Sequence, residues 1–276
     1  MRQTTTKFFF TILLLILPQF LLANTVVGLH IKGLPNDSVT NYVKTSLLKK
    51  YPPNDNSLMR DVTLTIGVEA LENALLSNQI IDIATGLTEA ETLQLVREFP
   101  TPLTQTLFVL SQPGFKCQMD LFERHYSSSN LSLGILLKNE TRNLYPLIKK
   151  YAEQLTIKVT TWQSKLGETL ADGLNQLMRE QDVMILLAQS EFNQSTQLSA
   201  IVRQAEILEK HLIAASGYQI NSGITQGCII NNKDWLKSLL IVIEKINREH
   251  EIKSNHMYSS ELSNFRVIMP MITIIE

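Results

Sequence analysis

Short apolar segments alternate with amphipathic helical stretches along most of the chain, and this alternation constrains the fold more than any other feature. Several apolar segments are nearly uninterrupted, which is typical of strands buried on both faces of a parallel sheet. The stretches 141–155, 168–181 and 234–248 repeat apolar residues at helical spacing, with Asn232 or Asp234 as the expected N-cap of the last. This pattern predicts an α/β fold with mostly parallel sheets. Strands are expected at 25–31, 62–67, 80–85, 106–110, 131–137, 156–161, 183–188, 212–216 and 228–231, and 265–269 with 271–275 as one final strand interrupted by Pro270.

So many strands in a chain of 276 residues predict two small sheets rather than one large one. Turn-forming residues cluster at 111–114 and 217–223, where the chain is expected to change lobes. We therefore predict two doubly wound, Rossmann-like α/β lobes joined by a hinge. In such a fold the strand ends of both sheets face one cleft, and ligands bind there. The predicted limits are 24–110 plus 218–250 for the first lobe, 111–217 for the second, and 251–276 for a segment that returns across the hinge.

The N-terminus has the pattern of a secretory signal peptide. Arg2 and Lys7 precede an apolar run at 8–17, which ends at Pro18, and the small residue Ala23 follows. The run is too short to span a bilayer, which takes ~20 residues. We expect cleavage near Ala23 and a soluble protein in the periplasm.

The charge balance and the cysteine content narrow the function further. With 25 basic and 26 acidic residues, the chain lacks the basic excess that a nucleic-acid surface needs. The two cysteines, Cys117 in a predicted helix and Cys228 in a predicted strand, are far apart in sequence. We interpret them as half-buried thiols in preference to a bridge.

The sequence has no recognisable catalytic constellation. It lacks the Gly-x-Ser-x-Gly, Walker and Gly-x-Gly-x-x-Gly motifs. His250 and His256 are not spaced for one helix face, and we interpret them as part of a solvated surface rather than a metal site. Asp82 is either a buried functional acid or, as we prefer, a strand-edge residue facing a polar neighbour. We predict no catalytic residue, no metal and no cofactor.

Five segments resemble, in order and character, the substrate-binding proteins of ABC transporters with the type I periplasmic-binding fold. They cover most of residues 60–235. The first looks like a strand and helix of the first lobe, the second like the crossing to the second lobe, the next two like strands of that lobe, and the last like the return. They are TIGVEALENALL at 65–76, LFVLSQPGFKCQMDLF at 107–122, LSLGILLK at 131–138, DVMILLAQ at 182–189 and LIAASGYQINSGITQG at 212–227.

The resemblance implies a ligand site at the strand ends that face the cleft. There, backbone amides at the start of a helix suit a carboxylate, lysines suit an anion, and aromatic rings suit an apolar side chain. The candidate ligand-binding residues are Lys32, Gly67, Val68, Thr85, Gly86, Ser111, Gln112, Phe115, Lys138, Gln189, Ser216 and Tyr218.

The function that this resemblance implies is capture of a small, amino-acid-like ligand for a membrane permease, by a monomeric periplasmic protein. One alternative is a periplasmic sensor subunit of the same fold that docks on a membrane signalling receptor. Another is an exported enzyme with an unrecognised site around Asp82 or Glu191.

Overall fold

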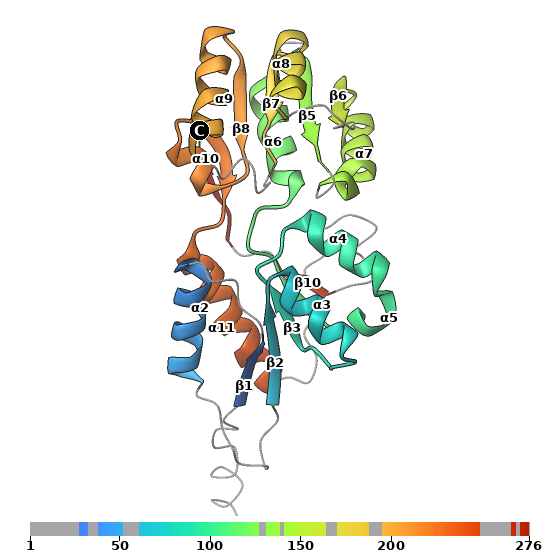
Figure 1. The fold of residues 1–276 in the computed structure, drawn as a ribbon, viewed down its shortest axis with the longest axis vertical. Helices are drawn as coiled ribbons and strands as arrows, with labels where there is room; N and C mark the ends of the chain where they lie inside the picture. The colour runs from blue at the N-terminus through green and yellow to red at the C-terminus, as the bar shows by residue number, and fades with distance from the viewer. Residues whose placement is uncertain are drawn as a thin grey trace, which may run out of the picture.

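Two α/β lobes stack along the long axis of the molecule (Figure 1). The chain is seen in a computed structural model. The expected signal peptide, His250 and His256 lie outside the described residues. The described residues are 28–32, 38–51, 61–126, 131–138, 141–163, 170–187, 195–248, 266–268 and 271–275.

The first lobe is built on a parallel sheet with the strand order β1-β2-β3-β4-β10. Alternation of side chains along the strands supplies an apolar surface to each face of the sheet. Ile83 and Leu107 point to one face, and Ala84 and Phe108 to the other. The strands are β1 (Gly28–Lys32), β2 (Asp61–Ile66), β3 (Ile83–Thr85), β4 (Leu107–Val109) and β10 (Arg266–Ile268).

Helices cover both faces of this sheet. α2 (Ser38–Lys50) and α11 (Asn232–Arg248) pack on one face, where Leu47 and Leu239 are fully buried against the strands. α3 (Val68–Leu76), α4 (Glu89–Glu98) and the short α5 (Pro100–Leu103) lie on the other side in Figure 1.

The second lobe has a sheet with the order β11-β9-β8-β7-β5-β6. Its strand pairs are parallel, except that β11 runs antiparallel to β9. Its strands are β5 (Leu133–Leu137), β6 (Val159–Gln163), β7 (Val183–Ile185), β8 (His211–Ala214), β9 (Gln226–Ile229) and β11 (Thr273–Ile275). Its helices are α6 (Phe115–Tyr126), η2 (Arg142–Leu144), α7 (Tyr145–Leu155), α8 (Leu170–Glu180), α9 (Ser195–Ile207) and α10 (Gly217–Asn221).

The mixed α/β architecture with parallel sheets in two lobes confirms the predicted fold class. The chain passes between the sheets after β4, after β9 and between β10 and β11. The predicted lobe limits stay a prediction. Strand pairing bears on one of them, the expected return to the first lobe at residue 218. β9 pairs with β8, so Gln226–Ile229 lies in the second sheet although the first lobe was expected to resume at residue 218. The reason is that the turn cluster at 217–223 contains α10 and a return to the same sheet.

The interpretation of the cysteines as free thiols is wrong. Cys117 on α6 and Cys228 on β9 form a disulfide, with their Cα atoms 6.3 Å apart. The helix and strand expected for them are correct, and it is the packing of α6 against β9 that brings them together. The bond therefore ties the start of α6, just after the first crossing, to the strand that precedes the second crossing.

Asp82 precedes β3 and accepts a hydrogen bond from the Thr63 backbone N–H at 2.9 Å. Asp182 occupies the matching place before β7, where it accepts from the Ser132 backbone N–H at 3.0 Å and from the Ser132 hydroxyl at 2.7 Å. These bonds, with Lys210 as a further partner, lower the pKa of Asp182. Through its bond to Thr63 of β2, Asp82 links two strands of the first sheet. This agrees with our preferred interpretation of Asp82 as a strand-edge residue that faces a polar neighbour.

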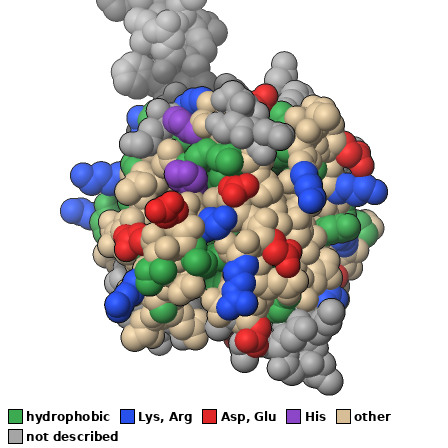
Figure 2. Space-filling view, turned by 90° about the horizontal axis from the view of Figure 1, so that it is seen from above, with side chains coloured by type: hydrophobic (Ala, Val, Ile, Leu, Met, Phe, Trp, Pro, Cys, Tyr) green, Lys and Arg blue, Asp and Glu red, His purple; other side chains and the backbone are tan. Residues whose placement is uncertain are grey.

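The surface seen from the second-lobe end carries acidic and basic side chains interspersed with apolar ones (Figure 2). None of the helices in the described part of the chain is both long and apolar enough to cross a membrane.

Replacing Gly227 with alanine is expected to destabilise the second lobe by about 1–3 kcal/mol, measured by urea unfolding. A Cβ at this position would lie 2.7 Å from the Ala214 Cβ and 2.8 Å from the Ala214 carbonyl oxygen. The neighbouring strand backbone must then shift. Gly217→Ala is the matched control, because nothing lies within 4 Å of its added Cβ. Equal stability of the two variants would contradict the packing described here.

Candidate functional site

A cavity of about 650 Å³ lies between the two lobes. Its size suits a small molecule, since ligand pockets measure ~300–1,000 Å³. Loops at the carboxyl ends of strands in both sheets line it, as expected for open α/β sheets. The lining residues are Ile66, Gly67, Gly86, Ser111, Gln112, Pro113, Ala215, Ser216, Gly217, Tyr218, Asn221, Ile229, Ile230, Asn231, Asn232 and Trp235.

Half of the candidate residues from the sequence come together around this cavity. They are Gly67, Gly86, Ser111, Gln112, Ser216 and Tyr218. That these residues bind a ligand stays a prediction, but their common location is what the strand-end argument requires.

The other candidates lie elsewhere. Val68 is half-buried against the apolar core, and Phe115 is buried beside a smaller cavity. Lys138 is not among the residues that line the main cavity, and its backbone N–H donates to the Thr141 hydroxyl at 3.1 Å. The side chain of Lys32 and the whole of Gln189 lie outside the described residues.

Thr85 lies directly behind the cavity wall, fully buried. Its hydroxyl donates to the Val109 carbonyl at 2.6 Å and accepts from the Trp235 indole N–H at 2.8 Å. Thr85 therefore positions Trp235, which is 4% exposed and does line the cavity. The strand-end argument placed Thr85 near the site but assigned it a direct contact with the ligand.

Two glycines shape the first-lobe wall. Gly67 and Gly86 have φ of 88° and 71°, in the left-handed region that side chains disfavour. A Cβ on Gly86 would lie 2.9 Å from Ile66 Cγ2 and 3.0 Å from the Gly67 nitrogen. The two strand-end turns thus meet backbone to backbone, and Gly67 leads directly into α3.

The second-lobe wall is held by Gln219, which is fully buried. Its side-chain oxygen accepts from the Ala215 N–H at 2.7 Å, and its amide nitrogen donates to the Leu187 carbonyl at 3.1 Å. Ser216 caps α10 by accepting from the Gln219 N–H. These bonds fix the turn that places Tyr218, with 37% of its surface exposed, at the cavity.

Several cavity residues that sequence reasoning missed come from the second crossing between the lobes, and others, such as Pro113 and Asn221, come from elsewhere. Asn231, Asn232 and Trp235 line the cavity where the chain enters α11. The N-cap was expected at Asn232 or Asp234, but the Asn231 side chain accepts from the Asp234 N–H at 2.9 Å, so the cap lies one residue earlier. An Asn three residues before an Asp, ahead of an apolar stripe, is the sequence signal for this helix start that the prediction did not use.

A buried acid lies beside the cavity. Glu89 is the first residue of α4 and accepts from the Phe115 N–H at 2.8 Å. Burial raises the pKa of Glu89 to about 7, although the hydrogen bond from Phe115 works in the other direction. Across the described stretches, no three His, Cys, Asp or Glu side chains are placed to hold a metal ion.

No protein-family model and no curated protein sequence matches the chain. Several solved structures do match over nearly their whole length. One is the ligand-free, open form of a substrate-binding protein with adhesive properties from Clostridium difficile, at 14% identity and TM-score 0.60, covering 90% of each chain. A second is an ABC domain in complex with L-Trp from Streptococcus pneumonia, at 13% identity and TM-score 0.55, covering 88% of this chain and 89% of that one.

A third is a glucose-galactose binding protein from Geobacillus stearothermophilus, at 9% identity and TM-score 0.52, covering 91% of this chain and 97% of that one. At such identities the likeness shows the fold alone. The chain has the type I periplasmic-binding-protein fold, and it resembles the substrate-binding proteins of ABC transporters.

Proposed function

We propose that this protein is a periplasmic solute-binding protein that captures a small organic ligand between its lobes and delivers it to an ABC-type importer. The observation that carries the proposal is the interlobe cavity of about 650 Å³, with hydroxyls, amides and aromatic rings contributed by both lobes. Groups of this kind, converging on one concave site, are what small-molecule recognition requires. A ligand that contacts both walls stabilises the closed arrangement of the hinge.

An amino-acid-like ligand is our preferred class. The backbone N–H groups that follow Gly67 open α3 at the cavity, and a helix start of this kind favours a carboxylate. Tyr218 and Trp235 provide aromatic surface for a side chain. One structural neighbour was solved with L-Trp, which supports the same class.

The proposal is tested by thermal unfolding of the chain lacking residues 1–23, against a panel of amino acids, nucleosides, sugars and small carboxylates. A true ligand at about 100 times its Kd stabilises the folded state by about 2.7 kcal/mol, which raises the Tm by roughly 5–10 °C in a chain of this length. The rise should disappear in Tyr218→Ala if that side chain contacts the ligand. A folded sample whose Tm no compound class raises would contradict solute capture and favour docking on a membrane sensor instead.

A further inference from the structure

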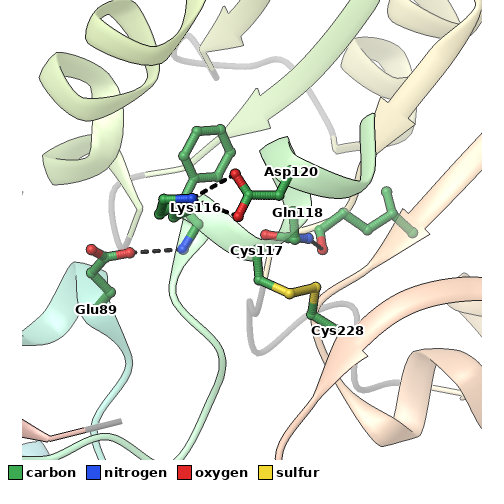
Figure 3. The surroundings of a disulfide bond; sticks show 8 residues. Glu89, Lys116, Cys117, Gln118, Asp120 and Cys228 are labelled. Carbon is green, nitrogen blue, oxygen red and sulfur yellow. Dashed lines mark hydrogen bonds and ion pairs between the residues drawn. A yellow bond between two sulfur atoms is a disulfide. The ribbon is translucent and has the colours of Figure 1, made fainter. Parts of the chain in front are cut away.

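One hydrogen bond joins the two lobes at the first crossing. Glu89 begins α4 in the first lobe, and its carboxylate accepts a hydrogen bond from the backbone N–H of Phe115, the first residue of α6 in the second lobe. Figure 3 shows the Glu89 side chain directed toward the start of α6. The carboxylate is buried, with 6% of the residue exposed. Among the described residues, the hydrogen-bond partner of this carboxylate is that single backbone N–H. A buried carboxylate with so few partners is costly, because it has lost most of the hydration that stabilises its charge.

Within the described part of the chain, a second polar group that lines a small cavity with Glu89 lacks a hydrogen-bond donor. Gln112 belongs to the segment that crosses between the lobes, and it lines both the interlobe cavity and a small adjoining cavity of about 20 Å³. Glu89 lines the same small cavity. The Gln112 side-chain oxygen is buried, and among the described residues no donor reaches it. A buried acceptor left without a donor costs ~1–3 kcal/mol.

A protonated Glu89 carboxyl is a hydrogen-bond donor, which matches the Gln112 side-chain oxygen as an acceptor. An ionised carboxylate only accepts hydrogen bonds, so ionised Glu89 and the Gln112 oxygen are two acceptors around one small cavity. A protonated carboxyl can donate its O–H while its other oxygen continues to accept the Phe115 N–H. Protonation of Glu89 therefore supplies a donor for the Gln112 side-chain oxygen and removes the buried charge.

We propose that Glu89 is a proton-sensitive positioning residue, whose neutral carboxyl bonds to Gln112 and holds the crossing segment in the shape that lines the cleft. Solute binding is then coupled to proton uptake at Glu89. This coupling rests on the proposed function, whereas the proton-dependent bond at the lobe junction does not.

The surrounding charges allow this titration near neutral pH. The pKa of Glu89 is raised to about 7 by burial. Tyr151 on α7 packs against Phe115, and the pKa of its hydroxyl is raised to about 12 by burial and by the nearby carboxylates Glu89 and Asp120, so it stays neutral. On α6, Lys116 pairs with Asp120 at 2.6 Å.

The direction of the pH effect follows from the raised pKa. The buried arrangement binds the proton more tightly than an arrangement in which the carboxyl meets water, where its pKa is 4.5. The buried arrangement therefore loses stability as the pH rises from about 4.5 through about 7. Solute affinity should fall in the same direction, by at most about tenfold per pH unit because one proton is linked.

The test without solute compares wild type, Glu89→Gln and the control Glu98→Gln from pH 5.5 to 8.5. The readouts are Tm and the hydrogen-exchange protection of the Phe115 amide, corrected for intrinsic exchange. In wild type and in Glu98→Gln, an exposed site on the same helix, protection should fall as the pH rises through about 7. Glu89→Gln keeps a neutral side chain at every pH, so its protection should be flat. The same decline in all three variants would overturn the proposal.

A second measurement needs no change at Glu89. The ¹³C signal of the Glu89 carboxyl in wild type should titrate with a midpoint near 7, and Gln112→Leu, which removes the acceptor, should lower that midpoint. A wild-type midpoint near 4.5, or no effect of Gln112→Leu, would overturn the proposal.

L-tryptophan is the probe for the coupling to binding. Its affinity should fall from pH 6 to pH 8 in wild type and stay constant in Glu89→Gln. Binding with the same pH profile in both proteins would overturn the coupling. Absence of binding at every pH would overturn the coupling to this probe, while the exchange and titration results still decide whether Glu89 and Gln112 act as proposed.

Discussion

Replacing both Cys117 and Cys228 with alanine is expected to lower the free energy of unfolding by about 3–5 kcal/mol. The disulfide closes a loop between residues 111 apart, so it removes a large amount of conformational freedom from the unfolded chain. The Cys228 side chain is also fully buried, and its truncation adds a smaller packing loss. Urea unfolding at constant pH measures the difference, with the slope of the transition checked for two-state behaviour.

Reduction of the wild-type protein provides the matched control for this prediction. A reducing agent should bring the wild type down toward the double variant while leaving the double variant unchanged, because no other pair of cysteines exists in the chain. If the double variant lost less than about 1 kcal/mol, or if reduction had no effect on the wild type, the bond would not constrain the chain as described.

Replacing Trp235 with alanine is expected to cost about 3–5 kcal/mol of stability and to abolish solute binding. The indole is 4% exposed and belongs to the apolar cluster between α2, α11 and the first sheet, so its removal leaves a large void. It also takes away one wall of the interlobe cavity and the donor that bonds to the Thr85 hydroxyl.

Trp235→Phe separates these contributions. Phenylalanine keeps most of the buried surface but has no N–H, so the expected loss is about 1 kcal/mol from the bond to Thr85, plus a small packing term. Thr85→Val tests the same bond from its other partner, and the two substitutions together should cost less than the sum of each alone. Equal stability of Trp235→Ala and Trp235→Phe would show that the indole is not the packing element described.

The central strands were predictable from sequence because they are buried on both faces of the sheets. Runs such as 131–137 and 183–188 are so apolar that few other structures accommodate them, and they correspond to β5 and β7. The expected clustering of strand-end residues also followed from topology. Parallel strands direct their carboxyl ends to one edge, which brought Gly67 and Ser111 to the same cavity as Ser216.

The remaining features depend on long-range packing, which local sequence patterns do not encode. The disulfide arises from the approach of α6 to β9, which the sequence positions of the two cysteines do not reveal. Trp235 lies four residues before Leu239 and seven before Val242, on one face of α11, so its pattern is that of a core helix residue. Its second role, as a cavity wall, comes from where α11 starts relative to the opposite lobe.

Tryptophan fluorescence gives the most direct test of ligand capture between the lobes. The chain has two tryptophans, and Trp162 packs on Gly173 of α8 in the second lobe, away from the cavity-lining residues. Trp162→Phe therefore leaves Trp235 as the sole indole reporter at the cavity. Titration of this variant with the compound that raises the Tm most should give a saturable change in emission, with the same Kd as calorimetry. Calorimetric binding that leaves the Trp235 emission unchanged, or a folded variant that binds no compound of the panel, would contradict a ligand site between the two lobes.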